Sequence, residues 1–509
     1  MPSIDINPDF RRAFHLIEEE GKNLFLTGKA GTGKSTFLRY FRENTKKKVV
    51  VLAPTGVAAL NVEWATIHSF FRFPPHITEE EVVKKARSVE KDDIYHHIDL
   101  IIIDEISMVR ADLLDFVDIF LRNVKKSDVP FWWIQMLMIG DLYQLPPVVS
   151  GEEKQYFREA YLSPFFFSSH VITEGGFDME LIELDHIYRQ SDEHFISLLN
   201  AIRNRSITDA EIEMLNTRID ATFEDPDFIT LTPTNDLADT INGRELEKLR
   251  GRSTIFQAKV QGDFGERNYP TDVSLALKKW ARVMFLYNDA NNRWVNGSIG
   301  TVEFIEEDAV MVAIDGEKSP VRVEPHTWEV KRYAYDRMTR SLSTESVGSF
   351  TQIPLRLSWA VTIHKSQGKT FDRVILDIGR GMFAHGQAYV ALSRCRTLEG
   401  MVLKKPLKPA HVILDYAVIT FLTKYQYARS EASSSLEDKI AILEKSMHEA
   451  TPIEIVYLKS NDTKSKRSIR VQSIREEVYM GKSFLAVRWF CLMRQEERVF
   501  RVDRILEIR

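Results

Sequence analysis

The segment that most constrains the fold of this chain spans residues 28–35, close to its start. It reads Gly-Lys-Ala-Gly-Thr-Gly-Lys-Ser and fits the pattern G-x-x-x-x-G-K-[ST], in which backbone N–H groups curl around a β-phosphate. An apolar run at 24–27 precedes it, and apolar residues at helical spacing follow it. A chance glycine-rich turn is the alternative, but a strand, a tight turn and a helix in this order predict a nucleotide-binding α/β domain.

Two acidic residues at the end of a later apolar run supply the partner that such a loop needs. Residues 100–103 are Leu-Ile-Ile-Ile, and Asp104 and Glu105 follow directly. A run without polar alternation is expected of a strand buried in a parallel sheet, where ligands gather at the carboxyl ends. Acids there can also simply begin a helix. After a phosphate loop, we expect Asp104 to face Mg²⁺ and Glu105 to orient the attacking water of an ATP-hydrolysing enzyme.

The length and composition of the chain predict several domains and no membrane contact. Its 509 residues exceed the roughly 100–200 residues of one domain, and no apolar stretch approaches the ~18 residues of a spanning helix. Its start lacks the features of a signal peptide, and its two distant cysteines predict neither a disulfide framework nor a cysteine zinc site. We therefore expect a cytoplasmic protein. The net charge of −5 does not exclude nucleic acid, since a basic channel can lie within an acidic total.

Further segments, in one order along the chain, resemble motifs of superfamily 1 helicases. They are Ala-Pro-Thr-Gly-Val-Ala-Ala at 53–59, Thr-Ile-His-Ser-Phe at 66–70, Gly-Asp-Leu-Tyr-Gln-Leu-Pro-Pro at 140–147, Leu-Asp-His-Ile-Tyr-Arg-Gln at 184–190, Trp-Ala-Val-Thr-Ile-His-Lys-Ser-Gln-Gly-Lys-Thr-Phe at 359–371 and Ala-Tyr-Val-Ala-Leu-Ser-Arg at 388–394. Taken singly, several have ordinary structural interpretations, such as surface salt bridges for the arginines. Their joint order carries the resemblance.

Over about residues 7–415 the sequence is similar to the Pif family of superfamily 1B DNA helicases, with RecD-like relatives, and residues 112–142 resemble the family's signature. There are two departures. Trp132 and Trp133 follow Phe131 where the family usually has two glycines. Because indole side chains cannot copy the backbone freedom of glycine, we expect a different local turn. Residues 8–12 also offer no Gln to contact the adenine edge, which leaves the preference for ATP over other NTPs open.

The resemblance implies a role for each residue at a matching position. The implied catalytic residues are Lys34, Asp104, Glu105, Gln144, Arg189 and Arg394. The implied nucleotide contacts are Gly28, Ala30, Gly31, Thr32, Gly33, Lys34, Ser35, Thr36, Gln144, Arg189, Gly368 and Arg394, with Ser35 and Asp104 as Mg²⁺ ligands. Gln144 would sense the γ-phosphate, Arg189 would come from the second domain, and Arg394 would act as an arginine finger.

The implied DNA contacts lie in four segments of the chain and would hold phosphates and sugars rather than base edges. They are Pro54, Thr55, Gly56, His68, Ser69, Phe71, Asn296, His364 and Lys365. The aromatic residues Phe70, Phe71 and Phe73 either stack on bases or wedge a duplex, or else fill a core. The sequence leaves both possibilities open.

The implied fold is α/β, with two RecA-like P-loop NTPase domains, a small Src-homology-three-like β-barrel inserted in the second, and a C-terminal mainly-β domain. The expected boundaries are 1–175 for the first domain, with a short wedge-like insertion at about 70–97, 176–260 and 346–415 for the second, 261–345 for the barrel, 416–451 for a helical linker and 452–509 for the C-terminal domain. Asn-Gly at 296–297 and Asp-Gly at 315–316 are turn signals that favour the barrel.

The last 58 residues differ from the rest in charge, with 13 Lys and Arg against 8 Asp and Glu. Residues 483–490 and 498–505 resemble parts of a WYL domain, a module typical of bacteria. The basic excess predicts an accessory surface for single strands or for a nucleotide ligand; the alternative is a solvated face on a structural cap.

The function implied is an ATP-dependent DNA helicase, moving 5′→3′ on single-stranded DNA and unwinding tailed duplex or structured DNA in replication, repair, recombination or telomere maintenance. The polarity comes from the resemblance alone. We expect a monomer associated with a bacterial nucleoid. Two alternatives remain: a single-strand translocase without unwinding, and a ligand-responsive DNA-binding regulator with a dormant ATPase. The intact Lys34, Glu105 and Arg394 argue against dormancy.

Overall fold

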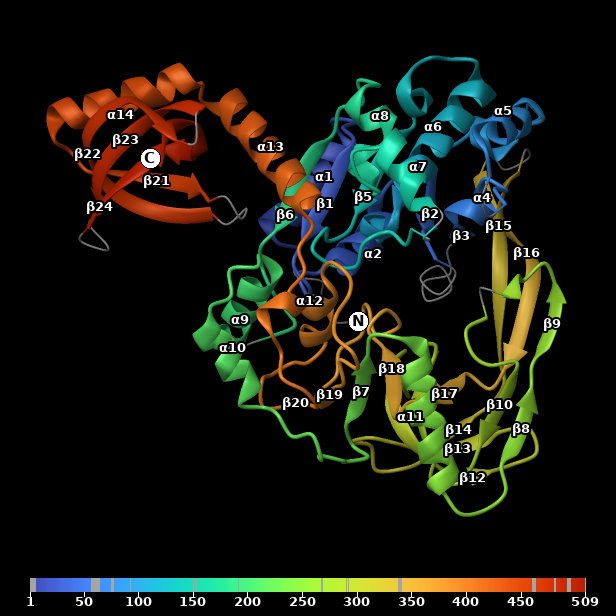
Figure 1. Cartoon of the computed structure of the whole chain (residues 1–509). Helices are drawn as coiled ribbons and strands as arrows, with labels where there is room; N and C mark the ends of the chain where they lie inside the picture. The colour runs from blue at the N-terminus through green and yellow to red at the C-terminus, as the bar shows by residue number, and fades with distance from the viewer. Residues whose placement is uncertain are drawn as a thin grey trace. The chain divides into compact units, whose positions relative to one another are not determined.

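The computed structural model describes most of the chain in two compact units (Figure 1). The described residues are 6–55, 65–74, 77–91, 93–149, 151, 153–190, 192–266, 269–289, 291, 293–336, 341–459, 464–479, 482–491 and 496–508. One unit comprises Met1–Asn200 and Thr208–Ile413, and the other comprises Ala201–Ile207 and Leu414–Arg509. Within the described ranges, no helix has both the length and the apolar content needed to cross a membrane.

A six-stranded parallel sheet forms the first half of the larger unit, in the order β3-β2-β4-β5-β1-β6. Its strands are β1 (Leu24–Gly28), β2 (Val49–Ala53), β3 (Ala65–Thr66), β4 (Leu100–Ile103), β5 (Gln135–Ile139) and β6 (Glu180–Leu184). The apolar runs at 24–27 and 100–103, predicted as strands, are confirmed as β1 and β4. The expected boundary at residue 175 is wrong, because β6 pairs in parallel with β1 and extends this domain to at least Leu184.

Helices cover this sheet. They are α1 (Pro8–Glu18), α2 (Lys34–Asn44), α4 (Ile67–Phe70), α5 (Glu79–Arg87), α6 (Ala111–Lys125), α7 (Glu153–Ala160) and α8 (His170–Thr173). Phe10 of α1 and Phe37 of α2 share one core with Leu24 and Leu26 of β1, while Phe25 between them contacts Phe166 instead. Because side chains alternate along a strand, α1 and α2 lie on one face of the sheet and Phe166 on the other.

A second, four-stranded parallel sheet has the order β18-β7-β19-β20. Its strands are β7 (Ile229–Thr232), β18 (Ala360–Thr362), β19 (Val374–Leu376) and β20 (Met401–Leu403), which confirms the predicted second α/β domain. The helices of this part are α9 (Glu193–Arg203), α10 (Asp209–Asn216), α11 (Asn235–Lys248) and α12 (Gln387–Leu392).

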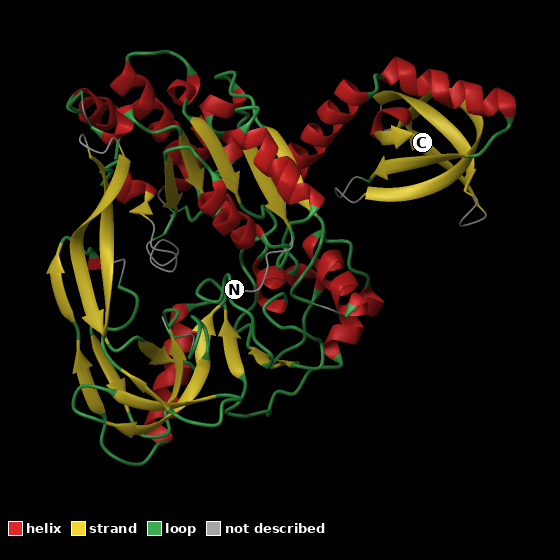
Figure 2. Ribbon diagram, turned by 180° about the vertical axis from the view of Figure 1, so that it is seen from behind, coloured by secondary structure: helices red, strands yellow, loops and turns green. Residues whose placement is uncertain are grey.

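Antiparallel strands are inserted between β7 and β18, and Figure 2 draws them in yellow with the other strands. They are β8 (Thr254–Gln257), β9 (Lys259–Gly262), β10 (Ser274–Leu277), β11 (Arg282–Phe285), β12 (Ile299–Ile305), β13 (Val310–Ile314), β14 (Val321–Val323), β15 (His326–Asp336), β16 (Ser341–Gln352) and β17 (Leu355–Leu357). They form sheets in the orders β14-β13-β12-β11-β17, β15-β16-β9 and β10-β8. The predicted limits, 261–345, are too narrow, since β8 and β17 belong to these sheets.

The C-terminal unit is a five-stranded antiparallel sheet in the order β24-β23-β22-β21-β25, preceded by α13 (Tyr416–Ser433) and α14 (Leu436–Glu449). The strands are β21 (Ile453–Leu458), β22 (Lys464–Tyr479), β23 (Lys482–Cys491), β24 (Glu496–Arg501) and β25 (Ile505–Ile508). Leu443 of α14 is buried in one core with Ile455 and Trp489 of the sheet. The prediction of 416–451 as a linker is therefore wrong for α14, which is part of the C-terminal fold.

Candidate nucleotide and DNA sites

The phosphate loop lies between β1 and α2, where the sequence places it. Gly31 and Gly33 have φ angles of 82° and 88°, in the left-handed region that favours glycine. A Cβ added at Gly31 would lie 2.5 Å from the Cβ of Arg189, so the loop and the Arg189 segment approach closely. The Nζ of Lys34 donates to the carbonyl of Gly28 at 2.7 Å and to that of Lys29 at 3.1 Å. The lysine is thus held inside the loop that would receive the phosphates.

The two acids follow β4 at the same edge of the sheet. Burial and the neighbouring Glu105 carboxylate raise the pKa of Asp104 to about 7. Burial also raises the pKa of Glu105, while the nearby positive charges of Lys34 and Arg394 oppose that shift. Carboxyl groups held in a desolvated place beside cations are typical of a functional site. Gln144 is buried next to them, and its Nε2 donates to Asp141 Oδ2 at 3.2 Å.

Two arginines face these groups. Arg394, only 1% exposed, follows α12 and donates through Nε to the carbonyl of Val390 at 2.9 Å and through Nη1 to that of Lys369 at 3.1 Å. Burial, and then the nearby Arg189, lowers the pKa of Arg394 to about 9. Arg189 donates to the carbonyl of Gly368 at 3.5 Å. Arg189 lies in the segment that joins β6 of the first sheet to α9, and its neighbour Gln190 donates to the carbonyls of Ser393 and Cys395 in the second domain. The origin of Arg189 in the second domain stays a prediction.

One pocket of about 910 Å³ lies between the two sheets. The phosphate loop, Glu105, Gln144 and the two arginines line it, whereas Asp104 does not. Of the predicted nucleotide contacts, the pocket is lined by Ala30, Gly31, Thr32, Gly33, Lys34, Ser35, Thr36, Gln144, Arg189, Gly368 and Arg394, with Glu105. Gly28 is not among the lining residues, and contacts the site through its carbonyl. The lining residues that the sequence did not indicate are Phe10, Arg39, Tyr188, Thr370 and Arg396. Two of these residues, Tyr188 and Thr370, lie within segments that resemble helicase motifs, and Arg396 lies two residues beyond such a segment. Their proximity to the motifs in the sequence could have indicated them.

The predicted DNA contacts fall into two groups. Pro54 and Thr55 follow β2, and His68 and Ser69 lie in α4, on the first domain. Gly56 lies outside the described residues. His364 and Lys365 lie in the loop after β18, and Asn296 precedes Gly297 in the insertion, where a Cβ at Gly297 would lie 3.2 Å from the Lys369 side chain. The long strand β15 of the insertion contacts β3 and α4, close to the first group.

The burial of Phe71 contradicts the predicted contact of this residue with DNA. Phe71 is 1% exposed and packs among Phe70, Phe73, Tyr95 and Phe120, with ring centroids 4.9–5.8 Å apart. A ring enclosed in this way has no face for a base. The three phenylalanines of this segment are core residues.

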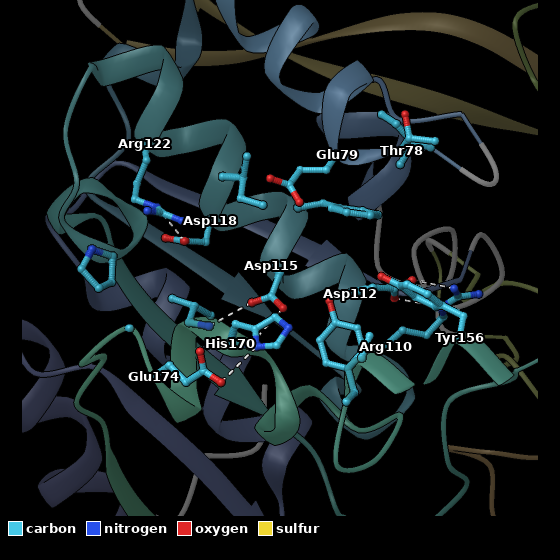
Figure 3. Close-up of a pocket in the computed structure, with 18 of the residues that line it drawn as sticks. Thr78, Glu79, Arg110, Asp112, Asp115, Asp118, Arg122, Tyr156, His170 and Glu174 are labelled. Atoms are coloured by element: carbon cyan, nitrogen blue, oxygen red, sulfur yellow. Dashed lines mark hydrogen bonds and ion pairs between the residues drawn. The ribbon is translucent and has the colours of Figure 1, made fainter. Parts of the chain in front are cut away.

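The signature segment lines a second pocket, of about 770 Å³, shown in Figure 3. Three aspartates of α6, three residues apart and therefore on one face of the helix, each hold a neighbouring segment. The Asp112 carboxylate pairs with Arg110 at 2.6 Å. The Asp115 carboxylate accepts from the backbone N–H groups of His170 and Val171, at 3.0 and 2.9 Å. The signature aspartates therefore act as anchors for the surrounding loops.

The third aspartate, Asp118, holds the turn with the two tryptophans. Its Oδ1 accepts from the backbone N–H of Phe131 at 2.7 Å, and the Phe131 ring contacts that of Phe177 at 5.0 Å. The φ angles of Phe131, Trp132 and Trp133 are 48°, 51° and 63°. Side chains here occupy the left-handed conformation that suits glycine, at a cost of roughly 1–2 kcal/mol per residue. The expected difference from the turn of the family stays a prediction.

Comparison with known proteins fits this geometry. A model of the PIF1-like helicase family matches residues 5–213. The ATP-dependent DNA helicase Pif1 of Bdellovibrio bacteriovorus is 31% identical over 436 residues, covering 83% of this chain and 93% of that protein. The ATP-dependent DNA helicase PIF1 of Homo sapiens is 33% identical over 430 residues, covering 82% of this chain and 64% of that protein, so the chain spans about two thirds of that relative.

Solved structures are similar as well. The crystal structure of Bacteroides sp Pif1 in complex with ADP-AlF4 is 36% identical, with a TM-score of 0.73 over 83% of this chain and 97% of that one. Bacteroides Pif1 bound to single-stranded DNA is 36% identical, with a TM-score of 0.59 over 82% of this chain and 96% of that one.

Proposed function

The chain belongs to the PIF1-like helicase family, and on that premise we propose that it is an ATP-dependent DNA helicase that moves 5′→3′ on single-stranded DNA and unwinds duplex. The observation that carries the proposal is the pocket in which the phosphate loop and Glu105 of the first domain meet Arg394 of the second. A nucleotide held there would contact both domains, so hydrolysis could open and close the cleft.

In this function, each group has a physical task. Lys34 binds the β- and γ-phosphate oxygens, and Glu105 orients the attacking water. Arg189 and Arg394 stabilise the charge that develops on the transferred phosphoryl group. Gln144, held near Asp141, senses the γ-phosphate from the first domain.

The residues present fit Mg²⁺. The ion is commonly held by one or two protein oxygens, with phosphates and water completing the set. Ser35 in the first turn of α2 and Asp104 at the end of β4 supply a hydroxyl and a carboxyl. The pKa of Asp104, raised to about 7 by burial and Glu105, describes a carboxyl whose ionised form a cation would stabilise. Bound Mg²⁺ would neutralise phosphate charge. In the described part of the chain, no cluster of three or more His, Cys, Asp or Glu side chains offers another metal site.

Discrimination among the bases of different NTPs depends on the residues at the end of the pocket near α1. Asn7 uses its Oδ1 to cap α1, accepting from the N–H of Phe10 at 2.8 Å, and its Nδ2 donates to the Tyr188 hydroxyl at 3.3 Å. Both the Oδ1 and the Nδ2 of Asn7 thus have partners within the protein. We therefore expect the ring of Tyr188 to support a base by stacking, with weak discrimination among NTPs.

The DNA path would run along Thr55, His68 and Ser69 on the first domain and Asn296, His364 and Lys365 on the second, with phosphate and sugar contacts giving sequence-tolerant binding. RecA-like domains, a Src-homology-three-like insertion and a WYL-like C-terminal domain are proposed on sequence resemblance and on the strand orders described above. The C-terminal excess of Lys and Arg supports an accessory surface for single strands. We also propose that the protein acts as a monomer.

Stimulation of ATP hydrolysis by single-stranded DNA tests the proposal. A helicase should hydrolyse ATP many times faster with a single strand than without it. A translocase without unwinding would show the same stimulation but leave tailed duplex intact. A ligand-responsive regulator with a dormant ATPase would show no stimulation, and that result would reject the proposed function.

A further inference from the structure

Helix α12 joins the two walls of the nucleotide pocket through one hydroxyl group. All six residues of Gln387–Leu392 are buried, and Tyr389 is 3% exposed. The hydroxyl oxygen of Tyr389 accepts a hydrogen bond from the backbone N–H of Ala30 at 2.9 Å. Ala30 belongs to the phosphate loop of the first domain, whereas α12 belongs to the second. The bond therefore exists only when the two domains are close together.

The start of α12 touches a second element of the first domain. His385 Nε2 lies 2.7 Å from the carbonyl oxygen of Leu142; because a carbonyl only accepts, Nε2 carries the proton. Gly386 has a φ of 69°, and a Cβ there would overlap the carbonyl oxygens of Tyr143 and Gln144. The segment that carries Gln144 thus rests against the N-terminal end of α12.

The other end of α12 leads to Arg394, two residues beyond Leu392. Arg394 bonds back to the helix through the carbonyl of Val390. Burial lowers the pKa of both Arg394 and Arg189, and the phenol of Tyr389 opposes the shift in each case. The Tyr389 side chain therefore lies near both arginines as well as the phosphate loop.

We propose that Tyr389 is a positioning residue for ATP hydrolysis: its hydroxyl ties the phosphate loop to α12 and so holds Arg394 and Arg189 in register with the nucleotide in the closed cleft. Tyr389 is not among the residues that line the pocket, so it acts through Ala30 and the arginines rather than by touching substrate. The inference rests on the proposed function, since it assigns a role within the same hydrolytic site.

The proposal predicts different effects of losing the Tyr389 hydroxyl on kcat and on KM for ATP. Initial binding of ATP depends on Lys34, Ser35 and the loop amides, all from the first domain. Alignment of the arginines depends on closure, which the Tyr389 hydroxyl stabilises. Loss of the hydroxyl should therefore reduce the fraction of closed, competent complexes and lower kcat, while KM for ATP changes little. A hydroxyl with a purely structural role would instead affect the stability of folding, because its loss deprives the Ala30 N–H of its acceptor.

The test compares Tyr389→Phe with Tyr416→Phe, both of which remove one hydroxyl. Tyr416 is 70% exposed at the start of α13 and is not among the residues that line the nucleotide pocket. In the full chain, Tyr389→Phe should lower kcat of DNA-stimulated ATP hydrolysis about tenfold, the size expected for one buried hydrogen bond, with KM changed by less than about threefold. The thermal unfolding midpoint should stay near that of the wild type, and Tyr416→Phe should match the wild type throughout.

Two results would overturn the inference while leaving the proposed function intact. One is a kcat for Tyr389→Phe within about twofold of a wild type that DNA stimulates normally. The other is a loss of kcat that is fully accounted for by a lowered unfolding midpoint. If DNA does not stimulate the wild type at all, the proposed function falls, and this inference falls with it.

Discussion

The guanidinium of Arg394 donates to the backbone carbonyl of Lys369 at 3.1 Å, while the Lys369 Nζ lies 3.1 Å from the sulfur of Met284 in the insertion. One loop of the second domain, between β18 and β19, is thus held by the nucleotide-site arginine on one side and reaches the β-rich insertion on the other. The same loop carries His364 and Lys365, two predicted DNA contacts. This connection is a physical route by which a change at the nucleotide could reach DNA.

Arg394→Lys should abolish most DNA-stimulated ATP hydrolysis. Lysine keeps the positive charge but cannot reproduce the guanidinium bonds to Val390 and Lys369. We expect kcat to fall by roughly a thousandfold, the lower end of values for an arginine that stabilises phosphoryl transfer. Steady-state hydrolysis measures it, and Arg373→Lys, on the surface ion pair with Asp227, serves as the matched control. A variant with more than about a tenth of wild-type kcat would contradict the assignment.

Lys34→Ala should stop hydrolysis and spare binding to a single strand. The Lys34 ammonium lies within the phosphate loop, bonded to the carbonyls of Gly28 and Lys29, and no predicted DNA contact depends on it. Fluorescence anisotropy with a labelled single strand, without nucleotide, should give a Kd within about threefold of the wild type. Full hydrolytic activity in this variant would refute the site.

Phe71→Ala should destabilise folding by about 3–5 kcal/mol, the usual cost of removing a buried phenylalanine. The ring packs against Phe70, Phe73, Tyr95 and Phe120 and has no exposed face. Thermal unfolding should show the loss. Normal stability combined with a selective loss of DNA affinity would restore the stacking role that the structure excludes.

Trp133→Gly should stabilise the protein. Trp133 is 81% exposed and has a φ of 63°, so glycine relieves backbone strain of about 1 kcal/mol and removes little packing. The unfolding midpoint of the first domain should rise. Leu162→Gly, at a residue 90% exposed and without positive φ, is the control and should not raise it. A lower midpoint for Trp133→Gly would mean that the indole makes contacts worth more than the strain.

Lys369 predicts a pH dependence of stability. Burial, followed by the nearby Arg356, lowers the pKa of Lys369 to about 7 from the usual value near 10.5. Between those pH values the unfolded chain binds more protons than the folded one at this residue, so stability rises with pH. Relative to Lys369→Met, the wild type should therefore gain stability from pH 7 towards pH 10, by at most about 1.4 kcal/mol per pH unit. Denaturant unfolding at a series of pH values gives the free energy of unfolding of the wild type minus that of Lys369→Met. A fall of this difference as pH rises from 7 towards 10 would contradict the prediction.

The strands β1 and β4 were predictable because burial on both faces leaves an unalternated apolar run. The edge strand β6 was missed as part of the first sheet for a related reason. Its sequence, Glu-Leu-Ile-Glu-Leu, alternates in part, and only its long-range pairing with β1 reveals its place. The predicted limits of the insertion were wrong for the same reason. The strands β8 and β17 are defined by pairing partners that the local sequence does not show.

Within the site, motif spacing predicted which groups meet but not how they are held. The tryptophan turn was judged from intrinsic backbone preference, and distant contacts from Asp118 and Phe177 override that preference. Phe71 was ambiguous because a ring that fills a core and a ring that stacks on a base look alike in sequence. Tyr389 lies within the recognised segment 388–394, but its partner, Ala30, lies 359 residues away, so the sequence did not indicate their contact.

Unwinding of tailed duplexes tests the central claim most directly, because it reports activity and polarity together. The account predicts that a duplex with a 5′ single-stranded tail is separated in the presence of ATP and Mg²⁺, that one with a 3′ tail is not, and that Lys34→Ala separates neither. Separation of the 3′-tailed duplex alone would contradict the proposed polarity. Failure to separate either duplex, under conditions in which a single strand stimulates ATP hydrolysis, would contradict the claim that this protein is a helicase.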